Sequence, residues 1–253
     1  MGAGRDTLAV VIRTADYKDN DKMVTLLTRD YGRMSANVRG AKKPASKLFP
    51  AASLFCCGEY SFYEKDGRYG VKGCVIRRTF FGLQNDFDAY AVACFIADAV
   101  DKVAQEDDVS ASLFTLTINA LYALDTAIAS PLVVVCYFLQ RLLHIEGVYP
   151  SLSACALCGT QQGLKSFSAE HGGVLCPACG NSGSLAIDEA FLKSLRCLAR
   201  TAPKDLGALN MDEDMQKKLA ASLVAYLEHV LGRPLKTAKF IFEMKKNLPI
   251  VNK

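Results

Sequence analysis

The sequence has no apolar stretch long enough to cross a membrane. Its longest uninterrupted hydrophobic run, Leu132–Leu139, ends at Gln140, whereas a membrane-spanning helix needs about 20 apolar residues. The first residues, Met1–Asp6, contain no apolar signal core, and Asp6 stands where a myristoylation site needs serine or threonine. We therefore expect a soluble, cytoplasmic protein.

Recognisable catalytic motifs are also missing. The chain has no phosphate-binding P-loop, no GxSxG and no spacing typical of a nucleophile–histidine–acid triad. Its three histidines, His144, His171 and His229, have no catalytic residue types beside them. The sequence therefore does not indicate an enzyme. Its 253 residues, 51% of them hydrophobic, are enough for one large domain or two to three small ones.

Cysteine is plentiful, and four of the ten cysteines form two tight pairs. These four residues are Cys155, Cys158, Cys176 and Cys179. Each CxxC pair can place two thiolates on one face of a tight turn, and two such turns complete a tetrahedron around Zn²⁺. Gly159 and Gly180 directly follow the pairs, where we expect the backbone of the turn to need conformational freedom. The spacing predicts one zinc ion with four sulfur ligands.

Two disulfides or four buried thiols are the alternative for these cysteines. They would need an oxidising compartment or an apolar setting, and neighbours such as Gly172, Gly173 and Pro177 supply neither. Four thiolates leave no open coordination position, so a structural zinc is expected and a zinc enzyme is not. The motif of zinc-dependent deaminases is absent. Six further cysteines lie in apolar surroundings and are expected to be small buried hydrophobes: Cys56, Cys57, Cys74, Cys94, Cys136 and Cys197.

Charge is segregated along the chain. Residues 1–80 carry 15 Lys and Arg against 8 Asp and Glu, residues 81–154 carry 2 against 9, and residues 155–253 carry 13 against 9. Such segregation suggests separate modules with separate partners, and a basic N-terminal third favours a phosphate-bearing partner such as nucleic acid. A basic surface that only keeps the protein soluble is the alternative.

The first 80 residues predict a small β-barrel. Runs rich in Val, Ile, Leu and aromatic residues alternate with turn signals, and no helical pattern is long enough to cover a sheet. The expected strands are Thr7–Thr14, Lys22–Arg29, Arg33–Gly40, Leu54–Lys65 and Val71–Phe80. Five strands in so short a segment suit an OB-fold, the commonest small barrel that binds oligonucleotides.

From residue 81 the pattern is helical, so the fold class is α+β with several domains. Apolar residues recur at helical spacing, with Asp86 and Ser110 as expected N-caps and Pro131 opening a largely apolar helix. The expected helices are Asn85–Gln105, Ser110–Ala129, Pro131–Gly147, Asp188–Arg200, Asp212–Leu231 and Thr237–Asn247. We predict an OB-fold barrel in residues 1–80, an α-helical domain in residues 81–152 and 187–253, and a four-cysteine zinc module in residues 153–186 inserted into the helical domain.

The third strand and the loop after it are the best candidate for a nucleic-acid surface. Met34, Ala36 and Val38 alternate with polar and basic residues, so one face of the strand is apolar and the other carries Arg33 and Arg39. The expected DNA-binding cations are Arg33, Arg39, Lys42, Lys43 and Lys47, with Tyr31 and Phe49 nearby for stacking. A solvated edge strand kept soluble by its charge is the alternative.

A second, weaker candidate lies in the helical part. Arg141 is the only basic residue between Lys102 and Lys165, on a helix that otherwise reads as buried. It could receive a carboxylate of a partner, together with Arg196 or Arg200, or it could form an internal ion pair with one of the many acids of this region. The basic stripe of Arg196 and Arg200 could equally be a solvated helix face.

Taken together, these segments resemble the bacterial RecO family of recombination mediators. The resemblance rests on the order of barrel, helices, four-cysteine insert and returning helices, and on five local stretches: Thr25–Gly32, Arg39–Ser46, Tyr149–Cys155, Phe167–Cys176 and Gly232–Thr237. It covers essentially the whole chain. Some members of the family lack the cysteines, and this chain keeps all four. Two features depart from the family pattern: Lys18 and Asn20 stand near the first turn where an acid is expected, and the last helix is short.

The resemblance implies a non-enzymatic role in DNA repair. It implies binding of single- and double-stranded DNA, annealing of complementary strands, and action with RecR to load RecA onto strands covered by the single-stranded-DNA-binding protein. The acidic C-terminal tail of that covering protein would be a direct partner, and the protein would associate with the nucleoid. The alternative is an RNA-binding or translation-associated OB-fold protein with a structural zinc, since stacking and phosphate contacts do not read the 2′-hydroxyl.

Overall fold

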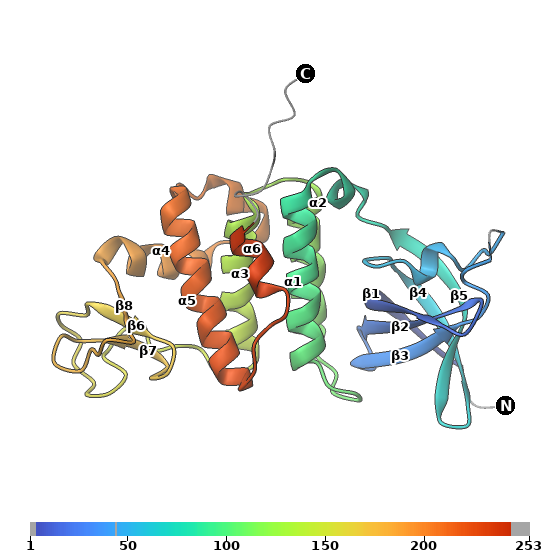
Figure 1. Cartoon of the computed structure of the whole chain (residues 1–253), viewed down its shortest axis with the longest axis horizontal. Helices are drawn as coiled ribbons and strands as arrows, with labels where there is room; N and C mark the ends of the chain where they lie inside the picture. The colour runs from blue at the N-terminus through green and yellow to red at the C-terminus, as the bar shows by residue number, and fades with distance from the viewer. Residues whose placement is uncertain (1–3, 44, 244–253) are drawn as a thin grey trace, which may run out of the picture. The chain divides into compact units, whose positions relative to one another are not determined.

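The computed structural model describes residues 4–43 and 45–243 (Figure 1). The chain divides into two compact units. The first consists of Met1–Asn85 and Ile96–Asp125, and the second of Asp86–Phe95 and Thr126–Lys253. The barrel belongs to the first unit and the four cysteines belong to the second, so each is described by itself.

Five strands form a closed barrel in the first unit. They are β1 (Arg5–Tyr17), β2 (Asp21–Thr28), β3 (Arg33–Val38), β4 (Cys57–Lys65) and β5 (Arg68–Arg78), in the order β1-β2-β3-β5-β4. A short parallel pairing of β3 with β5 closes the barrel, and the other neighbours are antiparallel. The predicted five-stranded, OB-like barrel is confirmed, with β1 starting earlier and ending later than the sequence suggested.

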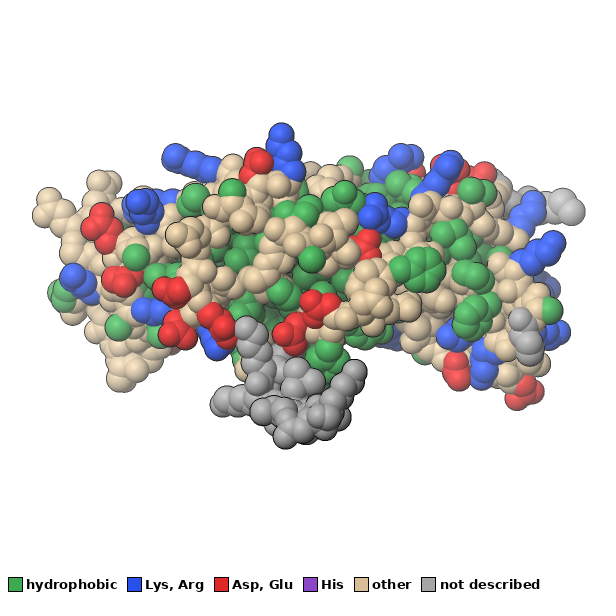
Figure 2. Space-filling model, turned by 90° about the horizontal axis from the view of Figure 1, so that it is seen from above, with side chains coloured by type: hydrophobic (Ala, Val, Ile, Leu, Met, Phe, Trp, Pro, Cys, Tyr) green, Lys and Arg blue, Asp and Glu red, His purple; other side chains and the backbone are tan. Residues whose placement is uncertain are grey.

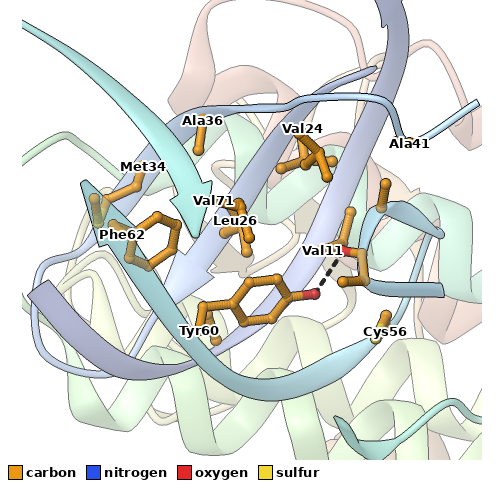
Figure 3. Packing of buried hydrophobic residues seen from close by; sticks show 14 residues of the cluster. Val11, Val24, Leu26, Met34, Ala36, Ala41, Cys56, Tyr60, Phe62 and Val71 are labelled. Atoms are coloured by element: carbon orange, nitrogen blue, oxygen red, sulfur yellow. Dashed lines mark hydrogen bonds between the residues drawn. The ribbon is translucent and has the colours of Figure 1, made fainter. Parts of the chain in front are cut away.

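Alternation of side chains along the strands fills the barrel interior. Met34, Ala36 and Val38 of β3 are buried, as predicted, while the residues between them face outward. Figure 3 shows Met34 and Ala36 in the same cluster as Tyr60 and Phe62 of β4. The Tyr60 hydroxyl donates a hydrogen bond of 2.8 Å to the carbonyl of Ala51, in the short 3₁₀ helix η1 (Pro50–Ala52). A buried hydroxyl needs such a partner, which fixes η1 against the barrel.

Helices make up most of the rest of the chain. The structure contains η2 (Phe81–Asn85), α1 (Phe87–Val103), α2 (Ala111–Asp125), α3 (Pro131–Ile145), α4 (Glu189–Arg200), η3 (Pro203–Ala208), α5 (Glu213–Leu231) and α6 (Ala238–Glu243). Asp86 and Ser110 accept hydrogen bonds from the first-turn N–H groups of α1 and α2, as predicted for N-caps. The last expected helix was predicted to reach Asn247, but residues 244–247 lie outside the described residues. Among the described residues, no helix is both long and apolar enough to span a membrane.

A three-stranded antiparallel sheet lies in the cysteine-containing segment of the second unit. It consists of β6 (Ser166–Ser168), β7 (Gly173–Leu175) and β8 (Leu185–Ala186), in the order β7-β6-β8. Phe167 of β6 is buried beside Phe191 of α4 and Tyr226 of α5, which ties this sheet to the helices. The assignment of residues 153–186 as a separate inserted module stays a prediction.

The six remaining cysteines only partly follow the expectation of burial. Cys56, Cys57 and Cys136 are buried, Cys74 and Cys94 are half-buried, and Cys197 is exposed. The prediction is therefore wrong for Cys197. That residue lies on the solvent side of α4, whose buried face is formed instead by Phe191, Leu195 and other apolar residues of the same helix.

Candidate metal centre and nucleic-acid interface

The sulfur atoms of the four paired cysteines cluster in one place. The Sγ atoms of Cys155, Cys158, Cys176 and Cys179 all lie within 4.8 Å of one another. A tetrahedral zinc site with bonds of about 2.3 Å places its sulfur ligands about 3.8 Å apart, and the Sγ atoms of Cys158 and Cys176 are 3.8 Å apart. All four are free cysteines, so the disulfide alternative is not realised. The donor set and its geometry suit a structural metal ion.

Each CxxC pair is a tight backbone turn. The N–H of Gly159 donates to the carbonyl of Cys155 at 2.9 Å, and the N–H of Gly180 donates to the carbonyl of Cys176 at 2.9 Å. Gly159 has φ of +76°, a conformation that favours glycine, as expected. Gly180 does not have a positive φ; instead a Cβ there would lie 3.0 Å from the Oγ of Ser166. Close packing, and not backbone freedom, therefore explains Gly180.

At these distances, neighbouring groups of the cluster shift the pKa values of the thiols. Backbone N–H groups of Cys158 and Cys176 lower the pKa of Cys155 to about 6, which favours the thiolate that binds metals. Hydrogen bonds with the side chains of Cys158 and Cys176 raise the pKa of Cys179 to about 12, because they favour its protonated thiol. A bound cation would favour the thiolate form of all four sulfurs.

The apolar core around the cysteine cluster is small. Its apolar core consists of the buried residues Cys155, Leu175 and Cys176, with Leu164 and a few partly buried neighbours packed against them. So small a core stabilises a fold only weakly, because little apolar surface leaves water. The apolar core alone therefore contributes little to the stability of this segment.

A groove of about 760 Å³ lies on the barrel, between β3, the β4–β5 hairpin and the turn between β1 and β2. The hairpin extends past the other strands of the barrel (Figure 1). The groove is lined by the cations Arg5, Lys18, Arg33, Arg39, Lys65 and Arg68. It is also lined by three tyrosine rings, Tyr17, Tyr63 and Tyr69, and by the carboxylates Asp66, Glu106 and Asp107. Cations outnumber carboxylates two to one on this surface.

The two predicted arginines, Arg33 in β3 and Arg39 just after it, have different partners. The Arg33 side chain is only 23% exposed, and its Nε donates to Asp101 at 2.8 Å. A second nitrogen of the same guanidinium, Nη1, lies 3.4 Å from a carboxylate oxygen of Glu106. Asp101 is nearly buried, with 8% of its side chain exposed, so this pair fixes β3 to the end of α1. Arg39 is exposed, and its guanidinium lies over the ring of Tyr63, 5.9 Å from the centroid.

The three predicted lysines lie in the loop after β3 but do not line the groove. Lys42 pairs with Asp16 at 3.0 Å. Lys43 and Lys47 are exposed, and no described carboxylate lies within 4 Å of either. The loop is held to the turn between β1 and β2, because Asp21 accepts a hydrogen bond of 2.8 Å from the N–H of Gly40. This hydrogen bond lowers the pKa of Asp21 below its ordinary value.

Neither aromatic ring predicted for stacking belongs to the groove. Tyr31 holds the guanidinium of Arg5, which lies 5.0 Å from its centroid and 5.1 Å from that of Tyr69. Phe49 is 52% exposed beside Lys22, outside the groove. Tyr63, Lys65 and the rest of the hairpin were not predicted as part of this surface. Asp66-Gly67 is a turn sequence between two of the expected strands, but no local pattern shows that this hairpin lies beside β3.

Other cations cover the barrel outside the groove. Figure 2 shows Lys and Arg side chains spread over the barrel, on the right of the view, among exposed hydrophobic side chains. Lys72 and Arg77 of β5 are exposed and do not line the groove, and Arg77 pairs with Glu59 at 2.7 Å. Part of the basic character of residues 1–80 is therefore ordinary solvated surface.

The three arginines of the second candidate site also differ in their partners. Arg141 donates to the carbonyl of Thr201 at 3.3 Å and lies 5.8 Å from the ring centroid of Tyr137. Among the residues that the structure describes, no carboxylate pairs with Arg141, so the internal ion pair that we considered is not formed, and its buried Nε has no hydrogen-bond partner. Arg196 donates to the carbonyl of Leu152 at 3.0 Å, and Arg200 is exposed.

Comparisons with known proteins agree along almost the whole chain. Residues 5–80 match the family model described as "Recombination protein O N terminal", and residues 84–239 match "Recombination protein O C terminal". A "DNA repair protein RecO" of Listeria monocytogenes serotype 4a is 28% identical over 239 residues, which cover 94% of this chain and 93% of that protein. Proteins of the same name from Acetivibrio thermocellus and Exiguobacterium sp. are each 28% identical, over 93% of this chain and 95% and 94% of their own lengths. The chain belongs to the RecO family of DNA repair proteins.

Proposed function

We propose that this chain is a DNA-binding recombination mediator that holds single- and double-stranded DNA on its barrel and anneals complementary strands. The observation that supports this role most directly is the groove beside β3, where six cations and three tyrosine rings line one surface. Cations neutralise phosphates and release counterions, and aromatic rings stack on bases without regard to sequence. A mediator that must act on any damaged sequence needs this kind of recognition.

The predicted cations contribute to this proposal in different ways. Arg39 is exposed at the edge of the groove, and Lys43 and Lys47 are exposed in the loop after β3, so all three are available to phosphates. Lys42 can leave Asp16 and bind a phosphate instead, because an ion pair as exposed as Lys42–Asp16 contributes only ~0–1 kcal/mol to stability. Arg33 keeps its partner Asp101 and supports the wall of the groove.

For the cysteine cluster we propose one structural Zn²⁺ held by Cys155, Cys158, Cys176 and Cys179. The cluster supplies four sulfur ligands and no open position, which is the pattern of structural and not catalytic zinc. We assign it to an inserted module in residues 153–186, between the parts of a helical domain in residues 81–152 and 187–253. In this role the ion stabilises the module and does no chemistry.

We further propose that the helical domain receives the acidic tail of the single-stranded-DNA-binding protein. Arg141 is the main candidate, since its buried Nε lacks a partner among the described residues and a carboxylate would supply one. Arg196 and Arg200 lie on α4 and would add charge. With RecR, the protein would then help to load RecA onto covered strands in the nucleoid.

A salt titration tests the proposed DNA surface. The double variant Arg39→Glu, Lys43→Glu should bind a labelled single strand more weakly at all sequences. Each lost phosphate contact should also flatten the dependence of log affinity on log salt by about 0.7. Two lost contacts predict a change of about 1.4, and annealing of complementary strands should fall in parallel, because the same surface holds both strands.

The matched control is Lys72→Glu, Lys193→Glu, which changes the net charge equally at exposed residues that lie neither in the groove nor in the loop after β3. It should leave the slope unchanged. An unchanged slope in the Arg39, Lys43 variant would return these residues to solvated surface, and the DNA-binding site would have to lie elsewhere.

A further inference from the structure

Tyr63 occupies a place in the groove that the neighbouring strand leaves open for it. Tyr63 of β4 lies opposite Gly70 of β5 in the antiparallel ladder. A Cβ at Gly70 would lie 2.2 Å from Cζ and 2.4 Å from the hydroxyl oxygen of Tyr63. The outer end of the ring therefore fills the position that any side chain at residue 70 would take, and only glycine allows the ring to lie there.

Gly70 also connects this ring to the predicted DNA-binding strand. It pairs with Asn37 of β3 in the parallel ladder that closes the barrel. Tyr63, Gly70, Asn37 and Arg39 all line the groove. The ring thus lies on the groove side of β5, next to the polar face of β3, and the guanidinium of Arg39 lies over it at 5.9 Å.

The other tyrosines of the groove have closer cationic partners. The guanidinium of Arg5 lies over the ring of Tyr69, 5.1 Å from its centroid, and also over the ring of Tyr31. Lys18 lies 5.3 Å from the ring centroid of Tyr17, in the turn between β1 and β2. Tyr63 is half-buried, and its cationic neighbour, Arg39, is exposed and lies 5.9 Å from the ring centroid, farther than the cations beside Tyr69 and Tyr17. Tyr63 is therefore the ring of the groove best placed to accept another flat group.

We infer that Tyr63 is a stacking site for an unpaired base, and that it makes the groove select single strands over duplex. The inference rests on the proposed binding of DNA by the barrel and names which form of DNA this site recognises. In a duplex the bases are stacked on one another and paired, so only phosphates reach the groove and the cations serve both forms equally. A single strand can place one base on Tyr63 while Arg39 neutralises the adjacent phosphate.

The test varies the ring and the bases together. Wild-type protein should bind a labelled oligothymidine about fivefold to 100-fold more tightly than the same backbone with abasic sites, the range that one base–aromatic contact typically contributes. Tyr63→Leu should lose this difference, binding both strands as the wild type binds the abasic one, with duplex affinity unchanged. Tyr63→Phe should behave as wild type, because the ring remains.

A second variant tests the same site while residue 63 remains tyrosine. Gly70→Ala should displace Tyr63, because its Cβ needs the space that the ring occupies, and should lower single-strand affinity as Tyr63→Leu does. Fluorescence of 2-aminopurine in the strand should be quenched on binding to wild type and Tyr63→Phe, and not on binding to Tyr63→Leu.

The outcomes separate this inference from the proposed function. If Tyr63→Leu still discriminates between the normal and abasic strands, or weakens duplex and single strand alike, the stacking site is wrong. If in addition Arg39→Glu, Lys43→Glu leaves binding to every strand unchanged, the proposed DNA surface on the barrel is wrong as well.

Discussion

The cysteine cluster and the groove of the barrel are built in opposite ways. All four sulfur ligands come from positions 155 to 179, in two turns of the same motif. The groove collects residues from positions 5 to 107, brought together by β1, β2, β3, the β4–β5 hairpin and the segment after α1. The cluster has almost no apolar core of its own, whereas the groove lies on a barrel filled by Tyr60, Phe62 and their neighbours.

The two sites therefore differ in whether they need their ligand to keep their shape. A cation would allow four thiols within 4.8 Å of one another to ionise together, so the proposed metal would be part of the fold of that segment. The groove needs nothing to keep its shape, because hydrogen-bonded strands and ion pairs such as Arg33–Asp101 already fix its walls. Removal of the ligand should therefore unfold one site and leave the other ready to bind.

The largest expected effect is on the cysteine cluster. Cys155→Ser or Cys176→Ser should lose the metal, and residues 153–186 should become sensitive to protease, because structural zinc contributes on the order of 10–16 kcal/mol in small zinc peptides. Affinity of the barrel for a single strand should stay near that of wild type. Metal content and limited proteolysis, measured on the same preparation, check this expectation.

The control for this experiment is Cys197→Ser, which changes an exposed cysteine outside the cluster. It should keep both the metal and the protease resistance. The prediction is wrong if purified wild-type protein lacks stoichiometric zinc. It is also wrong if a chelator leaves the proteolysis of residues 153–186 unchanged.

A smaller effect is expected at Arg141, where a partner would supply the missing acceptor. Arg141→Ala should weaken binding of an acidic peptide with a free C-terminal carboxylate by about tenfold or more, since a hydrogen bond to a charged group contributes ~1.5–3 kcal/mol. Binding of bare DNA should not change. Fluorescence anisotropy of the labelled peptide measures the first effect, and a labelled strand measures the second.

The control is Lys193→Ala, an exposed cation on α4. If it weakens the peptide as much as Arg141→Ala does, the interaction is general electrostatic attraction. If Arg141→Ala lowers peptide binding, DNA binding and the melting temperature together, Arg141 instead stabilises the helical domain through the carbonyl of Thr201.

The cysteine cluster could be predicted from the sequence more fully than the groove, because its residues are close together in the chain. Cys155 and its three partners were predictable because a CxxC spacing fixes a local turn whatever the rest of the chain does. The alternation of β3 likewise predicted that Met34 is buried and Arg39 exposed. Arg33 has the same pattern as Arg39, yet its partner Asp101 lies 68 residues away, and no local signal indicates that pairing. Tyr63 was missed because its role depends on Gly70 across the ladder.

The smallest expected effect concerns the loop that carries Lys42, Lys43 and Lys47. Asp21 accepts hydrogen bonds from the N–H of Gly40 at 2.8 Å and from the side chain of Asn37 at 3.3 Å. Gly40 has φ of +66°, so the chain turns sharply just after Arg39. The carboxylate thereby fixes the turn through which the exposed arginine and the following loop are oriented.

Asp21→Asn keeps an acceptor but removes its charge, so the Gly40 amide should exchange with solvent about fivefold faster at neutral pH. The reason is that a charged acceptor contributes ~1 kcal/mol more than a neutral one. The pKa of Asp21 is lowered in the folded protein, so its contribution is complete above its ordinary pKa of about 4 and is lost as the pH falls through the lower folded value. The difference between variant and wild type should therefore shrink in acid. Asp19→Asn removes the same charge at an exposed residue close by in sequence and should leave the exchange rate of the Gly40 amide unchanged. If Asp21→Asn and wild type still differ in this rate by the same factor at a pH well below the folded pKa, the shape of the side chain, and not its charge, holds the loop.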